Sequence, residues 1–253
     1  NFIRFTGAVP DFVPVREEDG FQFRIDRVKA RMGEDVRGIL VNSPANPTGT
    51  LVSPEVFRDL AELGVPIFSD EIYHGLVYAG EEHSALEFTD NCFVFNGFSK
   101  LYAMTGWRLG FVIAPRGYMN RLQTMQQNFF LCTSSIAQWA GVAALTQAGP
   151  DVERMKAIYD QRRRFMIDRL RELGFGIKFE PTGAFYVFAN ARKFTSDSMQ
   201  FTFDLLERAG VGVAPGVDFG PGGEGYIRFS YANSIENIGE GMRRLEKYLG
   251  GVR

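Results

Sequence analysis

Cysteine and histidine are scarce in this chain, whose 253 residues contain two of each. Cys92 and Cys132 lie far apart and have neither the CxxC spacing of a metal site nor the density of a disulfide-linked fold. Free cysteines in apolar surroundings are usually buried, so we expect two core thiols in a protein of the reducing cytoplasm. His74 and His83 belong to no Cys/His cluster, so we expect no metal site.

An excess of positive charge and a long apolar run are also missing. Lys and Arg total 28 against 30 for Asp and Glu, so nothing favours nucleic acid as a partner. No apolar run approaches the roughly 20 residues that cross a bilayer, so we expect no membrane association. Residues 1–4 lack the sections of a signal peptide and an initiator methionine, so we expect the chain to begin inside a larger protein.

The composition is that of a globular protein, with 45% hydrophobic and 23% charged residues and enough length for one large or two smaller domains. An apolar run at 36–41 predicts a buried strand, and Ser53 followed by Pro54 predicts a helix over 54–63. A second short strand over 65–68 then leads to Asp70. Strand, helix and strand in this order indicate a βαβ unit and an α/β fold with a mostly parallel sheet.

The rest of the chain changes its periodicity near Gly174. Before it, apolar runs predict strands over 92–95 and 109–114, mostly helix over 116–148, and a long helix over 151–173. After it, strands over 184–189 and 225–231 alternate with helices near 197–209 and 234–249, which predicts a smaller C-terminal α+β domain. We expect the basic run 162–164 on the long helix to face solvent.

Polar side chains cluster at the predicted turns and strand ends, where open α/β sheets bind ligands. The clusters are Asn46 in an Asn-Pro-Thr-Gly turn, Asp70 with Tyr73, Ser99 and Lys100 with Arg108, and Arg228 in a late strand. Each motif alone is weak, because short turns and Ser-Lys pairs are common.

In their order and spacing, these clusters resemble the signature of class I/II aminotransferases of fold type I, the aspartate-aminotransferase-like group. The resemblance rests on Asn-Pro-Thr-Gly at 46–49, Asp-Glu-Ile-Tyr at 70–73, and Ser-Lys at 99–100 followed by Gly-Trp-Arg at 106–108. It implies pyridoxal 5′-phosphate (PLP) as cofactor and a homodimer with active sites at its interface. It also implies an incomplete large PLP-binding domain over 1–160 and a small domain over 161–253.

The resemblance assigns the two central roles to Lys100 and Asp70. PLP acts as an electron sink when its ring nitrogen is protonated and a lysine holds its aldehyde, so the site needs one acid and one amine. Lys100 would form the imine and later move a proton as general base and acid. Asp70 would stabilise the pyridinium nitrogen.

The other cofactor and substrate contacts are also implied by the resemblance. Tyr73 and Asn46 would hydrogen-bond the cofactor's ring oxygen, Ser99 and Arg108 would bind its phosphate, and Arg228 would clamp the substrate α-carboxylate through two parallel hydrogen bonds. The serine that family members often place three residues before the lysine is replaced by Gly97, which weakens the phosphate assignments.

Structural interpretations of the same residues remain open. Lys100 could be a surface lysine and Asp70 a helix cap. Tyr73 could be a packing aromatic, and Arg108 and Arg228 could form structural ion pairs.

The sequence therefore predicts a PLP-dependent aminotransferase that moves an amino group between an L-amino acid and a 2-oxo acid. Two alternatives are a PLP-dependent C–S β-lyase on the same scaffold and a non-catalytic PLP-sensing domain of a transcriptional regulator. The resemblance also implies a further segment before Asn1 that completes the large domain, so we expect these residues alone to fold poorly or bind PLP weakly.

Overall fold

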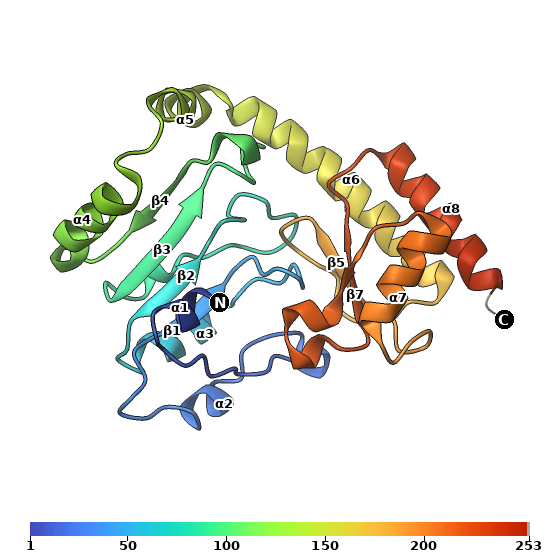
Figure 1. Ribbon diagram of the computed structural model, residues 1–253, viewed down its shortest axis with the longest axis horizontal. Coiled ribbons are helices and arrows are strands. Elements are labelled where there is room, and N and C mark those ends of the chain that lie inside the picture. Colours follow the sequence, from blue (N-terminus) through green and yellow to red (C-terminus); the bar gives the residue numbers. More distant parts are fainter. Residues whose placement is uncertain (252–253) are drawn as a thin grey trace.

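A four-stranded sheet organises the first half of the protein in the computed structural model, which describes residues 1–251 (Figure 1). The strand order is β1-β2-β3-β4; the first two pairings are parallel, and β4 is antiparallel to β3. The predicted strand–helix–strand unit and mostly parallel sheet are confirmed. The strands are β1 (Ile39–Asn42), β2 (Ile67–Asp70), β3 (Cys92–Gly97) and β4 (Gly110–Ile113).

Helix α3 (Pro54–Ala61) covers this sheet because its sequence places apolar side chains on one face. Phe57 and Leu60 are fully buried in a core that includes strand residues such as Ile67. The Ser53 hydroxyl accepts a hydrogen bond from the Val56 amide, which caps the helix as the sequence predicts. Two short helices precede the sheet, α1 (Phe2–Phe5) and α2 (Ile25–Lys29).

Three helices follow β4 and lead to the second half of the protein. Figure 1 shows the long α6 running from the side of the large sheet past the small sheet to lie beside α8. It ends at Gly174, whose φ of 94° is a left-handed conformation that suits glycine. The helices are α4 (Met119–Phe130), α5 (Ser135–Gln147) and α6 (Gly149–Leu173).

The second half is built on a three-stranded antiparallel sheet in the order β5-β7-β6. Its core joins the end of α6 to α7 and α8, with Ile167, Leu205, Ile227 and Leu245 almost fully buried. The predicted α+β arrangement is confirmed. Its elements are β5 (Tyr186–Asn190), α7 (Ser198–Asp204) continued by a π-helical turn (Leu205–Ala209), β6 (Ala214–Pro215), β7 (Tyr226–Ser230) and α8 (Ile235–Gly251).

The segment before β5 joins the two halves by backbone hydrogen bonds. The amides of Thr182 and Gly183 both donate to the Gly49 carbonyl, and the Ala184 amide donates to the Leu76 carbonyl. A Cβ on Gly183 would lie 2.7 Å from the Pro44 Cβ, so glycine permits this close approach. The Asn-Pro-Thr-Gly turn is therefore attached directly to the entry into the small sheet.

Two expectations were wrong about burial. Cys132 is exposed, because it lies in the connection between α4, which buries no side chain, and α5; only Cys92 is a core thiol. In the basic run, Arg163 is buried, and it donates hydrogen bonds to the Asp160 carboxylate and the Pro181 carbonyl. An ion pair and a backbone acceptor thus offset the cost of burying this guanidinium. Within residues 1–251, no helix combines the length and apolar character needed to cross a membrane.

Candidate functional site

Lys100 follows the carboxyl end of β3 and is half-buried rather than a surface lysine. Its Nζ lies 5.8 Å from the ring centroids of both Tyr73 and Phe185. Among residues 1–251 it forms no salt bridge. The amine therefore faces aromatic rings from both halves of the protein and is not held by a carboxylate.

Asp70 ends the neighbouring parallel strand, in register with Asn42 on one side and Phe95 on the other. Burial raises the pKa of its carboxyl, and the hydrogen bond from the Ile72 amide, 3.2 Å long, opposes that rise. Within residues 1–251 no Lys or Arg forms a salt bridge with it. A half-buried carboxylate without a cation is costly unless a positive ligand group reaches it.

Tyr73 is buried, and its hydroxyl lies 3.0 Å from the hydroxyl of Tyr186. Burial raises the pKa of Tyr73, so the phenol keeps its proton. The packing interpretation of Tyr73 is also correct in part, because its ring packs edge-on against Phe185 and Tyr186. The side chain thus combines packing with a protonated hydroxyl near Lys100.

Asn46 and Arg228 meet across the junction of the two halves. Arg228 Nη1 donates to Asn46 Oδ1 at 2.9 Å, and the guanidinium carbon lies 4.4 Å from the Tyr186 ring centroid and 4.9 Å from that of Phe219. Arg228 Nε is buried and has no hydrogen-bond partner among residues 1–251. The guanidinium therefore packs against two rings, and its buried Nε is a donor available to a ligand.

Ser99 and Arg108 are linked through Thr105, and Arg108 is more exposed than the other predicted site residues. Arg108 is exposed, its Nη1 donates to the Thr105 carbonyl, and the Thr105 hydroxyl donates to the Ser99 carbonyl. Neither Arg108 nor Arg228 forms a salt bridge among residues 1–251, so the ion-pair interpretation receives no support there. No hydrogen bond in this range joins Arg108 to Lys100 or Asp70.

Gly97 departs from the serine expected by resemblance, and the structure supplies a physical reason. A Cβ at this position would lie 2.9 Å from the Leu109 carbonyl oxygen and 3.0 Å from the Gly110 Cα. The antiparallel strands β3 and β4 approach too closely there for any side chain.

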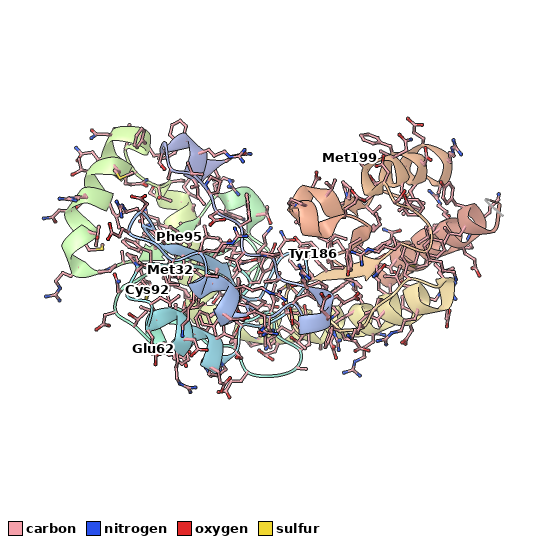
Figure 2. All side chains as sticks on the ribbon, turned by 90° about the horizontal axis from the view of Figure 1, so that it is seen from below. Met32, Glu62, Cys92, Phe95, Tyr186 and Met199 are labelled. Carbon is pink, nitrogen blue, oxygen red and sulfur yellow. The ribbon has the colours of Figure 1, made fainter. Side chains whose placement is uncertain are left out.

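Three aromatic residues that no sequence motif indicated surround the predicted polar groups: Phe185, Tyr186 and Phe219. Figure 2 shows Tyr186 between the two lobes of the protein. The available signal was the pair of aromatics directly after Gly183-Ala184, at the start of a predicted strand. Nothing local indicated that Tyr186 would contact both Tyr73 and Arg228, because these residues are far apart in sequence.

The groups left without partners define what could bind here. An amine at Lys100, a carboxylate at Asp70 and a buried donor at Arg228 suit a ligand with an electrophilic carbon, a basic ring nitrogen and a carboxylate. PLP with an amino or keto acid has this chemistry, so the residues present fit the cofactor. In residues 1–251 no three His, Cys, Asp or Glu side chains are grouped to hold a metal ion.

Comparison with known proteins identifies a family that matches the chain. The model of the family described as aminotransferase class I and II matches residues 1–245. A (5-formylfuran-3-yl)methyl phosphate transaminase from Methanocaldococcus jannaschii is 39% identical over 253 residues, covering 98% of this chain and 65% of that protein. An aspartate aminotransferase from Pyrococcus abyssi is 36% identical and covers 96% of this chain and 65% of its own length.

A solved structure extends the comparison to the fold. The aspartate aminotransferase from Thermus thermophilus with maleate has a TM-score of 0.92 at 34% identity, over 97% of this chain and 65% of that chain. The predicted fold type I architecture is confirmed. The chain spans about 65% of the length of these relatives.

Proposed function

Because the chain belongs to the class I and II aminotransferase family, we propose that it forms the catalytic core of a PLP-dependent aminotransferase. The enzyme would move an amino group between an L-amino acid and a 2-oxo acid. The observation that carries the proposal concerns one aromatic cluster at the junction of the two halves: the Lys100 amine and the Arg228 guanidinium lie against its rings, and the charge of Asp70 acts on its Tyr73.

Lys100 is the residue that performs the proton transfers. When bound, PLP supplies an electron sink that weakens the bond between the substrate Cα and its hydrogen. Lys100 Nζ would anchor the cofactor aldehyde, and as the released amine it would carry a proton between the substrate Cα and the cofactor C4′ carbon. Its position against the rings of Tyr73 and Phe185 limits hydration of the amine.

Asp70, Tyr73 and Asn46 would tune the cofactor. The Asp70 carboxylate has no other cation within residues 1–251, so a protonated ring nitrogen would offset its burial. Tyr73 keeps its proton and can donate it to the ring oxygen. The Asn46 side chain would face the same oxygen while its Oδ1 holds Arg228.

Arg228 would bind the substrate α-carboxylate. The rings of Tyr186 and Phe219 pack against its guanidinium, and its Nε, which has no partner within residues 1–251, leaves a donor for a carboxylate oxygen. Ser99 and Arg108 would bind the cofactor phosphate, because Arg108 is exposed and keeps donors beyond the one that bonds the Thr105 carbonyl.

Two further proposals concern organisation. We propose domains over 1–160 and 161–253, because buried residues from Val28 to Val94 form one apolar core and buried residues from Met166 onward form another. We also propose a homodimer, because α4 and α5 expose large apolar side chains that are normally covered in assemblies, including Phe129, Phe130 and Trp139. Light scattering of the full-length protein tests the dimer. A cytoplasmic location stays a prediction from the sequence.

The test of the proposed function is covalent trapping. The full-length protein is incubated with PLP, reduced with borohydride and mapped by peptide mass spectrometry, with Lys100→Arg as the matched control. A single adduct on Lys100, absent from the control, supports the proposal. Labelling elsewhere or no labelling contradicts it.

Amino-donor screening then separates the candidate reactions. Transfer of the amino group to a 2-oxo acid supports the aminotransferase. Pyruvate and ammonia from cystathionine would identify a C–S lyase, and trapping without any turnover would favour a PLP-sensing domain.

A further inference from the structure

Tyr186 contacts both Arg228 and Tyr73, although it belongs to none of the sequence motifs. It opens β5, and the β5–β7 register pairs Phe188 with Arg228. Alternate residues of a strand share a face, so Tyr186 is the diagonal neighbour of Arg228 on the same side of the sheet. This register brings the guanidinium carbon 4.4 Å from the Tyr186 ring centroid.

The backbone that delivers Tyr186 is held on several sides. Ala184 is fully buried with φ of 57°, a conformation uncommon for a residue with a side chain. Its carbonyl accepts hydrogen bonds from the hydroxyls of Tyr78 at 2.6 Å and Tyr231 at 3.2 Å, and its amide donates to Leu76. These contacts fix the start of β5, so the Tyr186 side chain is directed at the site by its surroundings.

The hydroxyl of Tyr186 then meets the hydroxyl of Tyr73 at 3.0 Å, inside the buried cluster. A phenol has one proton to donate and can accept two. If Tyr73 donates to Tyr186, no Tyr73 proton remains for any other acceptor. If Tyr186 donates to Tyr73, the Tyr73 proton is free for an acceptor in the pocket.

The position of Arg228 favours the second arrangement. A cation over the face of a phenol ring draws electron density from it and makes its O–H a stronger donor. A chain of hydrogen bonds in a buried site is strengthened when each donor is polarised by the previous one. Here the first contact, Arg228 with Tyr186, is a cation–π contact and the second, Tyr186 with Tyr73, is a hydrogen bond, so the cation polarises the donor of that bond.

We propose that Tyr186 is a positioning residue that donates its hydroxyl proton to the Tyr73 oxygen, so that the Tyr73 proton is directed at the ring oxygen of the cofactor. The inference rests on the proposed function, which supplies the acceptor. Tyr186 thereby connects the carboxylate-binding arginine to the group that tunes the cofactor, by a path separate from the Arg228–Asn46 hydrogen bond.

The test is the pH titration of the visible absorption band of lysine-bound PLP in the full-length protein. Tyr186→Phe keeps the ring under Arg228 and removes only the hydroxyl. A weaker Tyr73 hydrogen bond makes the ring oxygen more basic and raises the proton affinity of the lysine-bound nitrogen, so we expect the titration midpoint to rise by about half a unit or more. Tyr248→Phe, which removes a hydroxyl on α8, should leave the midpoint unchanged.

A double-variant cycle establishes the path. Tyr73→Phe alone should raise the midpoint further, and adding Tyr186→Phe to it should cause no additional shift. Additive shifts would mean that Tyr186 acts on the cofactor directly, and an unchanged midpoint in Tyr186→Phe would mean that it plays no part; either result overturns the inference while the proposed function stands. An unsubstituted protein without a borohydride adduct on Lys100 overturns both.

A second readout separates the hydroxyl from the ring. Tyr186→Phe should leave KM for the amino donor within about twofold, because the face under Arg228 is preserved, whereas Tyr186→Leu should raise KM about fivefold or more by removing it. Equal losses in both variants would indicate a merely structural residue and count against the proposal.

Discussion

The two arginines of the candidate site have opposite surroundings. Arg228 is enclosed by the rings of Tyr186 and Phe219 and held by Asn46, and these contacts come from segments far apart in sequence. Arg108 is exposed, and its hydrogen bond in residues 1–251 is to Thr105, three residues away.

The difference shows which part of the site these residues organise on their own. A guanidinium with a fixed plane and a vacant donor is preorganised for a carboxylate. An exposed guanidinium held by one local carbonyl must lose side-chain freedom when it binds an anion. We therefore interpret the Arg228 side as already formed and the Arg108 side as completed by the ligand or by further protein.

The largest expected loss of activity comes from substituting Lys100, which leaves both arginines unchanged. Lys100→Ala removes the anchor and the proton carrier, so kcat should fall at least about 10³-fold, and the borohydride adduct should disappear. Carboxylate binding by Arg228 should persist, which calorimetric titration of PLP-loaded samples with a keto acid can measure. A variant that retains a tenth of the activity would refute the role of Lys100.

Asp70→Asn tests the carboxylate between the two sides. Loss of the charge opposite the ring nitrogen should lower kcat about 10²-fold. Activity close to that of the unsubstituted protein would show that Asp70 does not face the ring nitrogen.

The same variant has a distinct stability signature without cofactor. Burial raises the folded-state pKa of Asp70 above 3.8, so the stability linked to this group is present at low pH and is lost as the pH rises through the folded pKa. Asp70→Asn should therefore be as stable as the unsubstituted protein, or more so, at neutral pH in urea unfolding. A clear destabilisation there would contradict the absence of a cationic partner.

Arg228→Lys tests whether the arginine enclosed by aromatic rings binds the substrate carboxylate. An ammonium cannot reproduce the planar fork or its stacking, so kcat/KM for the amino donor should fall about 10- to 100-fold, mainly through KM. Asn46→Ala is the companion variant, with a smaller loss in the same direction. A change confined to kcat would argue against carboxylate binding by Arg228.

Arg108→Lys should have the smallest effect. The Kd for PLP should rise less than about tenfold, and urea unfolding without cofactor should change by less than about 0.5 kcal/mol, as for most exposed substitutions. If Arg108→Lys and Arg228→Lys lower the free energy of unfolding equally, the surroundings of the two arginines do not differ in how they hold the side chain, which contradicts the interpretation above.

Much of the fold was predictable because its signals are local. The Ser53 cap and Pro54, the apolar runs and the glycine after the long helix each act within a few residues, and the corresponding elements are present. The strand predicted over 184–189 lies at Tyr186–Asn190. It begins two residues later because the Ala184 amide and carbonyl form hydrogen bonds with Leu76, Tyr78 and Tyr231 and not with a neighbouring strand.

The sequence by itself determined the order of most helices and strands, the positions of Asn46, Asp70 and Lys100 at turns and strand ends, and the position of Arg228 within a late strand, since strand period and turn chemistry are set by neighbouring residues. Tertiary structure alone decided what surrounds them. It buried Arg163, exposed Cys132, excluded a side chain at Gly97 and placed Tyr186 between Tyr73 and Arg228. Burial and contact depend on which distant segments pack together, and no local pattern encodes that.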